Sequence, residues 1–453
     1  MKFKGFTKKQ LLEIYQNMAM SRYLDDKQLI LLKQGKGFFH IGCSGHEAAG
    51  MAAALAFKPG FDYAYPYYRD QAFCLGWGMT SRDHLLAFLA KEDDPSSGGR
   101  QMPQHYGHKE LKIVSQSSST GTQFLQATGA GFALQKNGEN GVAYVSSGEG
   151  TSSQGDFHEA LNWASRDKSP VIFHIENNGY AISVPIEDQT AGASVYKISA
   201  GYDNLARFNV DGTDFFETHL AFKKAVERAR KGKGPSLIQS DVVRLLPHSS
   251  SDDQRKYRPE KDLEADRKRD PLLTFANTCI DEGIAKQEDF DKIRDMVKSQ
   301  VDEDAEWAEV QADPISDDGQ KNVYFDADWQ NDPVPNPTGG EKIVLVDAIN
   351  HALDEELTHN AKMMVYGQDV AGGKGGVFTA TRGLTDKYGE DRVFNSPLAE
   401  SSIIGTAIGL ATLGYKPVVE IQFGDYIWYS MMQIRNEVAT MRYRSNGKWS
   451  CPI

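Results

Sequence analysis

Residues 141–183 read GVAYVSSGEGTSSQGDFHEALNWASRDKSPVIFHIENNGYAIS. Two short apolar runs, VAYVSS and VIFHIEN, flank a helical stretch, so the segment predicts a strand, a turn, a helix and a second strand. Similar apolar runs alternate with helical stretches from about residue 50 to residue 243. This alternation is typical of an α/β domain in which helices cover both faces of a parallel sheet.

Glu149 and Asn178 each follow one strand of this unit. Ligands of open α/β sheets bind beyond the carboxyl ends of the strands, so both side chains are expected at one ligand site. Mg2+ prefers oxygen ligands, phosphate oxygens among them. Gly148 and Gly150 allow a close backbone approach, and the following helix offers N–H groups to an anion. The unit therefore predicts a metal-bound diphosphate, although either fragment alone also fits an ordinary turn.

The composition is that of an ordinary folded protein. The chain has 453 residues, which is enough for two or three domains. Its 50 Lys and Arg against 62 Asp and Glu give a formal net charge of −12, which repels the phosphates of nucleic acids and anionic lipid heads. We therefore expect neither nucleic acid nor a membrane as a partner.

The amino terminus is too densely charged for a signal peptide, and no apolar run approaches the ~20 residues that span a bilayer. The four cysteines are scattered, without the paired spacing of a zinc site or a disulfide framework. A reducing compartment fits this pattern, so we expect a cytoplasmic protein.

The chain divides into two expected domains. Apolar positions at helical spacing predict an amphipathic helix over residues 7–35. Prolines and glycines in QNDPVPNPTGGEK break regular structure and place a linker at about 321–341, between domains at 1–320 and 342–453. In the second domain we expect the strands KIVLV (342–346), MMVYG (363–367), RVFNS (392–396) and KPVVEIQF (416–423), with helices over 347–360, 399–414 and up to Met441.

Several motifs together resemble one enzyme family. GEGTSSQGDFHEALNWA with ENNGYAIS resembles the α subunit of thiamine diphosphate-dependent 2-oxoacid dehydrogenases, and GRQMPQHYG with PHSSSDDQRKYR is closer to the branched-chain, 2-oxoisovalerate dehydrogenase-like members. NSPLAESSIIGTAIG and KPVVEIQFGDYIWYSMMQIRNEVATMRYRS resemble the start of the β subunit. The resemblance implies two transketolase-like domains fused in one chain. Relatives continue past the strand-like WSCPI at 449–453, so the second domain is expected to be incomplete.

The resemblance also implies the cofactor and its ligands. Mg2+ would be held by the carboxylate of Glu149, the side chain of Asn178 and the backbone carbonyl of Tyr180. Thiamine diphosphate would be contacted by Tyr68, Arg69, Ser118, Gly148, Glu149, Gly150, Thr151, Asn178, His248, Leu398, Glu400, Gln422 and Tyr426. A structural K+ site is implied at Ser117, Ser119, Thr122 and Gln123, although a serine-rich loop also reads as a helix cap.

Two residues are implied in catalysis. Glu400 would bond N1′ of the aminopyrimidine and activate the cofactor, but it also fits a carboxylate at a helix start. His248 would orient the substrate or acyl group, although an exposed loop histidine is the alternative. Leu398, Gln422 and Tyr426 would pack around the pyrimidine ring, or else belong to a core. Ser249 matches a site of phosphorylation in mitochondrial relatives.

The resemblance implies an enzyme that decarboxylates a branched-chain 2-oxoacid and transfers the acyl group to a lipoyl group of a partner acyltransferase. Glu149 and Glu400 come from different subunits in this superfamily, so a homodimer with interfacial sites is expected. Pyruvate or acetoin is an alternative substrate. A non-catalytic module that binds thiamine diphosphate or the acyltransferase core is an alternative function. A transketolase-type sugar enzyme would lack the HSSSDD loop.

Overall fold

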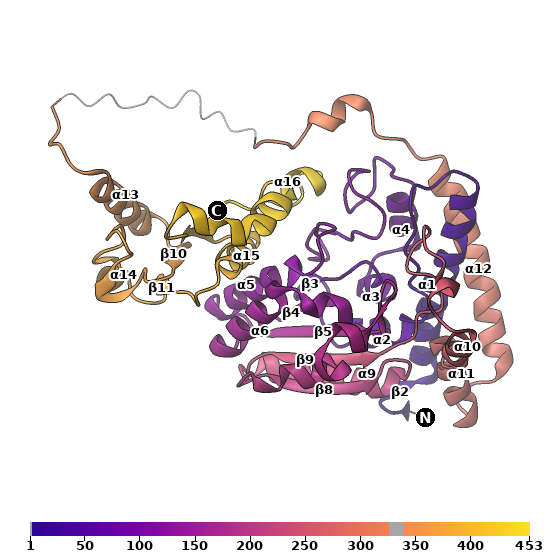
Figure 1. The fold of residues 1–453 in the computed structure, drawn as a ribbon. Coiled ribbons are helices and arrows are strands. Elements are labelled where there is room, and N and C mark those ends of the chain that lie inside the picture. The colour runs from indigo at the N-terminus through magenta and orange to yellow at the C-terminus, as the bar shows by residue number, and fades with distance from the viewer. Residues whose placement is uncertain (1, 326–338) are drawn as a thin grey trace.

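A computed structural model describes residues 2–325 and 339–453. It contains a five-stranded parallel sheet in the first part of the chain and a three-stranded parallel sheet in the second part (Figure 1). The expected α/β class, with parallel sheets covered by helices, is confirmed. In these two ranges no helix is long and apolar enough to cross a membrane.

The large sheet has the strand order β3-β4-β5-β9-β8, and all its strands are parallel. In its β4–β5 pair, Gly148 lies opposite Glu176, so these two strands end at the same level. The predicted strands of the quoted segment are therefore adjacent. The strands are β3 (Tyr63–Tyr65), β4 (Ala143–Gly148), β5 (Val171–Asn177), β8 (Ala206–Asp211) and β9 (Ser236–Asp241).

Alternate residues of the large sheet enter two separate cores. Ala143 and Val145 of β4 pack with Phe124 of α5 and Phe157 of α6, whereas Tyr144 faces the opposite core. Successive side chains of a strand point to opposite faces, so a strand that is apolar throughout is buried on both sides. The helices that contribute to these two cores include α2 (Glu47–Ala54), α3 (Gln71–Trp77), α5 (Thr122–Lys136), α6 (Gly155–Asp167) and α9 (Phe215–Arg230).

The predicted amino-terminal helix is confirmed as α1 (Lys8–Lys33), which packs against α12 (Gln287–Glu309). Thr7 caps α1, because its hydroxyl accepts a hydrogen bond from the backbone N–H of Gln10 at 3.3 Å. The remaining elements of this part are β1 (Lys2–Phe3), β2 (Phe6–Thr7), α4 (Ser81–Phe88), η1 (Glu149–Ser153), β6 (Tyr180–Ala181), β7 (Val184–Pro185), α7 (Ile186–Gln189), η2 (Ala191–Ala193), α8 (Val195–Ile198), η3 (Ser199–Gly201), η4 (Gln254–Lys256), α10 (Glu260–Lys268), α11 (Pro271–Asp281) and η5 (Ser316–Gln320).

The second part of the chain is built around the parallel sheet β11-β10-β12. Three of its four predicted strands and both of its separate predicted helices form. Its elements are α13 (Leu345–His359), β10 (Met363–Gly367), η7 (Gly372–Lys374), α14 (Leu384–Tyr388), β11 (Val393–Asn395), α15 (Glu400–Thr412), β12 (Lys416–Glu420), η8 (Gly424–Ser430), the π-helix η9 (Gln433–Val438) and α16 (Met441–Arg444).

Three expectations for the second part are wrong. KIVLV forms no strand in the part of the chain that the structure describes, because α13 begins at Leu345 and the preceding Ile343 and Val344 are exposed. The helix expected up to Met441 is split into 3-10, π and α turns. WSCPI, which lies in the described part of the chain, has no regular secondary structure, and Trp449 is instead buried in a core.

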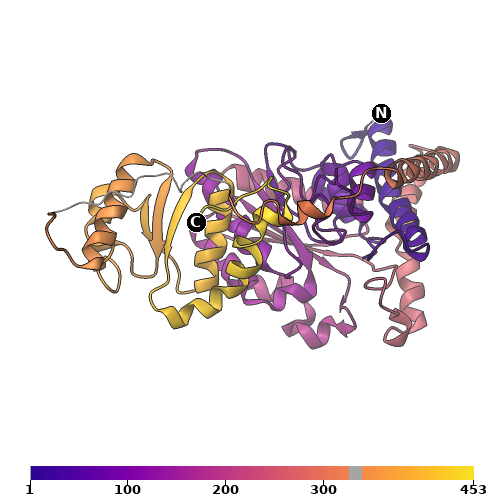
Figure 2. The same ribbon diagram turned by 90° about the horizontal axis from the view of Figure 1, so that it is seen from above.

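The two parts meet where α15 packs along α5 (Figures 1 and 2). The helices approach so closely that a Cβ atom on Gly409 would collide with the carbonyl oxygen of Gln126. A Cβ atom on Gly129 would likewise collide with the carbonyl oxygen of Thr406. Ile408 of α15 is buried in the same core as Phe124. The two parts therefore share one apolar core beside the large sheet.

Gly409→Ala is expected to lower the free energy of unfolding by about 1–3 kcal/mol, because the added methyl group overpacks this contact. Alanine favours an isolated helix over glycine by about 1 kcal/mol, so propensity alone predicts the opposite sign. Urea unfolding measures the difference. Gly201→Ala is the control, because a Cβ there meets nothing within 4 Å. Equal stability of Gly409→Ala and the unaltered chain would contradict the close packing.

Candidate active site

A pocket of about 550 Å³ lies beyond the carboxyl ends of β4 and β5. It gathers ten residues that the sequence analysis assigned to the cofactor or metal site. These are Tyr68, Arg69, Ser118, Gly148, Glu149, Gly150, Thr151, Asn178, Tyr180 and His248. Residues from five separate stretches of sequence thus converge on one cavity, as expected for the end of a parallel sheet.

Glu149 carries an unsatisfied oxygen inside this pocket. Its side chain is only 1% exposed, and its Oε2 accepts a hydrogen bond from the backbone N–H of Asn178 at 3.1 Å. Its Oε1 has no hydrogen-bond partner among the residues that the structure describes. Burial raises the pKa of Glu149, which nearby Arg244 and Arg69 partly offset. A buried carboxylate oxygen without a partner fits a cation ligand.

Asn178 and Tyr180 follow directly on the turn after β5. The Asn178 Oδ1 accepts a hydrogen bond from the backbone N–H of Tyr180 at 3.3 Å. Across both described ranges no group of three or more His, Cys, Asp or Glu residues could hold a metal ion. One carboxylate with neutral oxygen donors suits Mg2+ when phosphate oxygens and water supply the remaining ligands.

Gly150 is required by the packing of this turn. A Cβ atom on it would lie 2.5 Å from the Cβ of Ala181, which is closer than two carbon atoms can approach. The turn after β4 and the segment after β5 therefore touch through a position where only glycine fits. This contact holds Glu149 and Asn178 at the same end of the sheet.

Two buried arginines supply positive charge. Arg69 donates to the carbonyl oxygens of Gly42 and His248, and its Nη2 lies 3.0 Å from Nδ1 of His248. Arg244 donates to the carbonyl oxygen of Ile182 at 3.0 Å and to the hydroxyl of Tyr257 at 2.8 Å. Neither arginine forms an ion pair with a carboxylate in the described parts of the chain. The charge of Arg69, which lines the pocket, is thus available to a bound anion, and Arg244 adds to the positive potential near Glu149.

His248 is uncharged at neutral pH. Burial lowers its pKa to about 4, and the positive charges of Arg69 and Arg244 act in the same direction. Because its Nδ1 accepts from Arg69, the neutral ring carries its proton on Nε2. Arg244 was not among the residues expected near the site, although it stands four residues before His248 in the same RLLPHSSSDD segment.

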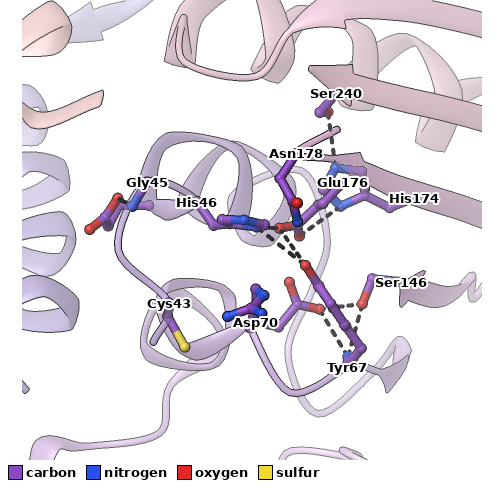
Figure 3. A network of polar contacts seen from close by, with 12 residues as sticks. Cys43, Gly45, His46, Tyr67, Asp70, Ser146, His174, Glu176, Asn178 and Ser240 are labelled. Atoms are coloured by element: carbon purple, nitrogen blue, oxygen red, sulfur yellow. Dashed lines mark hydrogen bonds and ion pairs between the residues drawn. The ribbon is translucent and has the colours of Figure 1, made fainter. Parts of the chain in front are cut away.

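A buried polar network includes Tyr67, which lines the pocket (Figure 3). Glu176 accepts a hydrogen bond from the hydroxyl of Tyr67 at 3.4 Å and contacts Nδ1 of His46, and Asp70 accepts one from the hydroxyl of Ser146. Burial raises the pKa of both Glu176 and Asp70. Sequence reasoning missed this network, and its signal was a polar residue inside an otherwise apolar strand, such as Glu176 in VIFHIEN.

The residues expected at K+ have protein partners in this structure. The hydroxyls of Ser117 and Thr122 donate to Glu437, and Ser119 accepts from Asn436. Gln123 donates to the carbonyl oxygen of Ser146 at 3.2 Å. Ser118, between these residues, lines the pocket with its Oγ 2.7 Å from Nε2 of His105.

The four expected pyrimidine contacts are placed apart from this pocket. Glu400 begins α15, and Leu398 is 82% exposed. Gln422 donates to Asp369 at 2.8 Å, and Tyr426 packs against Phe423. None of the four lines the pocket in the described part of the chain. Within one copy of the chain, the residues expected at the pyrimidine ring therefore lie outside the pocket that holds the residues expected at the diphosphate.

Comparison with known families agrees with this geometry. A family profile described as "Dehydrogenase E1 component" matches residues 15–316, and one described as "Transketolase, pyrimidine binding domain" matches residues 341–453. The chain belongs to the dehydrogenase E1 component family. This E1 chain thus carries both matched regions in one polypeptide. The two matched domains imply thiamine diphosphate as the cofactor.

The relatives of this E1 chain act on 2-oxoacids. The 2-oxoisovalerate dehydrogenase subunit alpha of Bacillus subtilis (strain 168) is 41% identical over 305 residues, covering 67% of this chain and 92% of that relative. The pyruvate dehydrogenase E1 component subunit alpha of Staphylococcus aureus (strain Mu50) is 34% identical over 298 residues, covering 65% and 77%. These similarities support 2-oxoacid decarboxylation.

Glu149→Gln is expected to abolish the stabilisation by Mg2+ with inorganic pyrophosphate, because the unpaired Oε1 is replaced by a poorer ligand. A ligand concentration of about 100 times Kd should stabilise the unaltered chain by about 2.7 kcal/mol. The metal-free variant should be no less stable, since it loses a buried, unpaired carboxylate. Thermal unfolding measures both effects, with the exposed Glu92→Gln as control. A Mg2+-dependent shift of full size in Glu149→Gln would exclude Glu149 as a ligand.

Proposed function

We propose that this E1 chain catalyses the oxidative decarboxylation of a branched-chain 2-oxoacid, with thiamine diphosphate held by Mg2+. One observation carries the proposal: the unpaired Oε1 of Glu149 lies beside Asn178 in a pocket that also contains buried Arg69. A cation with a polyanion attached to it satisfies both the carboxylate and the arginine. The family match supplies the identity of that polyanion.

The pocket residues would divide the binding between them. Glu149, the side chain of Asn178 and the backbone carbonyl of Tyr180 would hold Mg2+. Arg69, which lines the pocket and lacks a carboxylate partner across the described ranges, would face the diphosphate oxygens, and Arg244 would add positive charge from behind the lining residues. Tyr68 lines the same wall of the pocket. The helix that follows Gly150 adds backbone N–H groups to this positive surface.

Bound thiamine diphosphate supplies the carbanion-stabilising chemistry that allows the carboxylate of a 2-oxoacid to leave. Glu400 would hold a proton at N1′ of the aminopyrimidine. His248, neutral and with its proton on Nε2, would donate a hydrogen bond to the substrate or acyl group. Leu398, Gln422 and Tyr426 would enclose the pyrimidine ring and exclude water.

The complete site would form between two copies of the chain. Glu400 and its neighbours are outside the pocket of their own copy, whereas the adjacent surface exposes Leu398, Trp428 and Tyr429. Exposed apolar side chains of this size mark interaction surfaces. We propose a homodimer or a higher homo-oligomer in which residues 342–453 of one copy face the diphosphate site in residues 1–320 of another, with 321–341 as the linker.

The lining of the pocket supports a branched-chain substrate. Phe39, Ile41 and Met102 give it an apolar wall that would accommodate an aliphatic side chain. The more similar of the two relatives described above carries the name 2-oxoisovalerate dehydrogenase. Pyruvate is the second candidate, because the other relative is a pyruvate dehydrogenase subunit. The acyl group would pass to a lipoyl group of an acyltransferase in the cytoplasm.

Decarboxylation of 3-methyl-2-oxobutanoate and of pyruvate, measured with an artificial electron acceptor, tests this proposal. We expect turnover that requires thiamine diphosphate and Mg2+ and favours the branched-chain acid. Glu400→Gln should lower kcat by about 100-fold or more, because it removes the group that exchanges a proton with the pyrimidine. Exposed Glu390→Gln is the control.

The same assay separates the alternatives. Turnover of pyruvate in preference to the branched-chain acid would replace the proposed substrate. Binding of thiamine diphosphate without turnover of either acid would contradict the enzymatic function and favour a non-catalytic binding module.

A further inference from the structure

We propose that Glu437 is a positioning residue of the active site, which acts by holding the irregular segment 115–121 against the pocket. Ser118 of this segment lines the cavity and faces the expected cofactor. The inference rests on the proposed function for the identity of that cofactor. The contact itself does not depend on the cofactor. It joins Ser117 and Glu437, which are 320 residues apart in sequence.

Glu437 accepts hydrogen bonds from one hydroxyl before Ser118 and one after it. Its Oε1 accepts hydrogen bonds from Ser117 and, at 2.7 Å, from Thr122 at the start of α5. The Glu437 side chain is fully buried. Hydrogen bonds to a charged acceptor are about twice as strong as neutral ones, and low local polarity strengthens them further. The segment is therefore held on both sides of Ser118.

Arg444 completes the arrangement from the same part of the chain. Its Nη2 donates to Oε2 of Glu437 at 2.6 Å and to the backbone carbonyl of Ser115 at 3.0 Å. Arg444 is 5% exposed, so this is a buried ion pair. Removing one partner of such a pair leaves an uncompensated buried charge, which destabilises a protein strongly. Arg444 thus fixes both the carboxylate and the first residue of the segment.

Glu437 lies in the π-helix η9, whose neighbouring residues also reach the segment. Gln433 donates to the carbonyl oxygen of Thr122 at 3.1 Å, and Asn436 donates to the hydroxyl of Ser119 at 2.6 Å. π-Turns are rare and occur frequently at functional sites. Three residues of one π-helix therefore contact three residues around Ser118, although none of the three lines the pocket in the described structure.

The consequence for the pocket is direct. Ser117 and Ser119 are held by the second part of the chain, so Ser118 between them is fixed with its side chain toward the cavity. Its hydroxyl then meets Nε2 of His105 at 2.7 Å, and both side chains line the pocket. Without Glu437, the hydroxyls of Ser117 and Thr122 would lose their acceptor, and this wall of the pocket would lose its order.

Glu437→Ala in the full chain tests the inference by two measurements. Hydrogen–deuterium exchange without cofactor should be about 10-fold faster in residues 115–121, which corresponds to the loss of about 1.4 kcal/mol of local stability. Tryptophan fluorescence during titration with thiamine diphosphate at saturating Mg2+ should show half-saturation at about 10-fold higher concentration. Glu437→Gln retains an oxygen acceptor for both hydroxyls, so it should restore part of the affinity.

Asp304→Asn is the matched control. Asp304 is 2% exposed and accepts from the hydroxyl of Ser81 and from Arg82, so it has the same kinds of partner as Glu437. It lines no part of this pocket among the described residues. The control should lose thermal stability but keep the exchange of 115–121 and the half-saturation for thiamine diphosphate unchanged.

Each outcome decides the inference. Unchanged exchange in 115–121, or unchanged half-saturation despite faster exchange, would overturn the role of Glu437. Equal changes in the Asp304→Asn control would also overturn it, because they would reflect general destabilisation. If Glu437→Ala does not fold, Glu437→Gln is judged by the same comparisons. If the unaltered chain does not bind thiamine diphosphate, the proposed function fails, and the exchange data alone judge whether Glu437 holds the segment.

Discussion

The parallel pairing of β4 with β5 is the constraint on which the rest of the structure depends. Their common end point allows the residue after one strand and the turn after the other to share a pocket. Alternate residues of both strands are buried in different cores. A register shift of one residue would therefore move each side chain to the opposite face of the sheet, into the core that it does not fit. The packing of two cores thus fixes the geometry of a site that neither core contains.

The pocket combines opposite charges that do not neutralise each other. Glu149 is buried with one oxygen free, while Arg69 and Arg244 bond to carbonyl oxygens and neutral groups. A direct ion pair would satisfy both charges and leave nothing for a ligand. Because the charges stay separate, a ligand that itself contains a cation and a polyanion meets a complementary partner at each point. The protein retains this arrangement at a cost in its own stability.

Local patterns predicted the first part of the chain well, because its signals are local. The runs around β4 and β5 are apolar throughout, and the Gly-Glu-Gly and Asn-Asn-Gly turns directly follow them. The predictions failed where the outcome depends on distant partners. KIVLV is as apolar as a buried strand, yet none of the described strands pairs with it: Ile343 and Val344 are exposed, and α13 begins at Leu345. Arg244, the network around Glu176 and the contact of Glu437 with Ser117 arise only when distant segments meet in three dimensions.

The approach of α5 and α15 constrains how this sequence can change over time. Gly129 meets the backbone of α15, and Gly409 meets the backbone of α5, so each glycine is opposed by main-chain atoms that cannot be trimmed by a second substitution. No compensating exchange of side chains can make room for a larger residue there. Substitutions at these two positions are therefore not tolerated, whereas the solvent-facing residues of both helices are free to diverge.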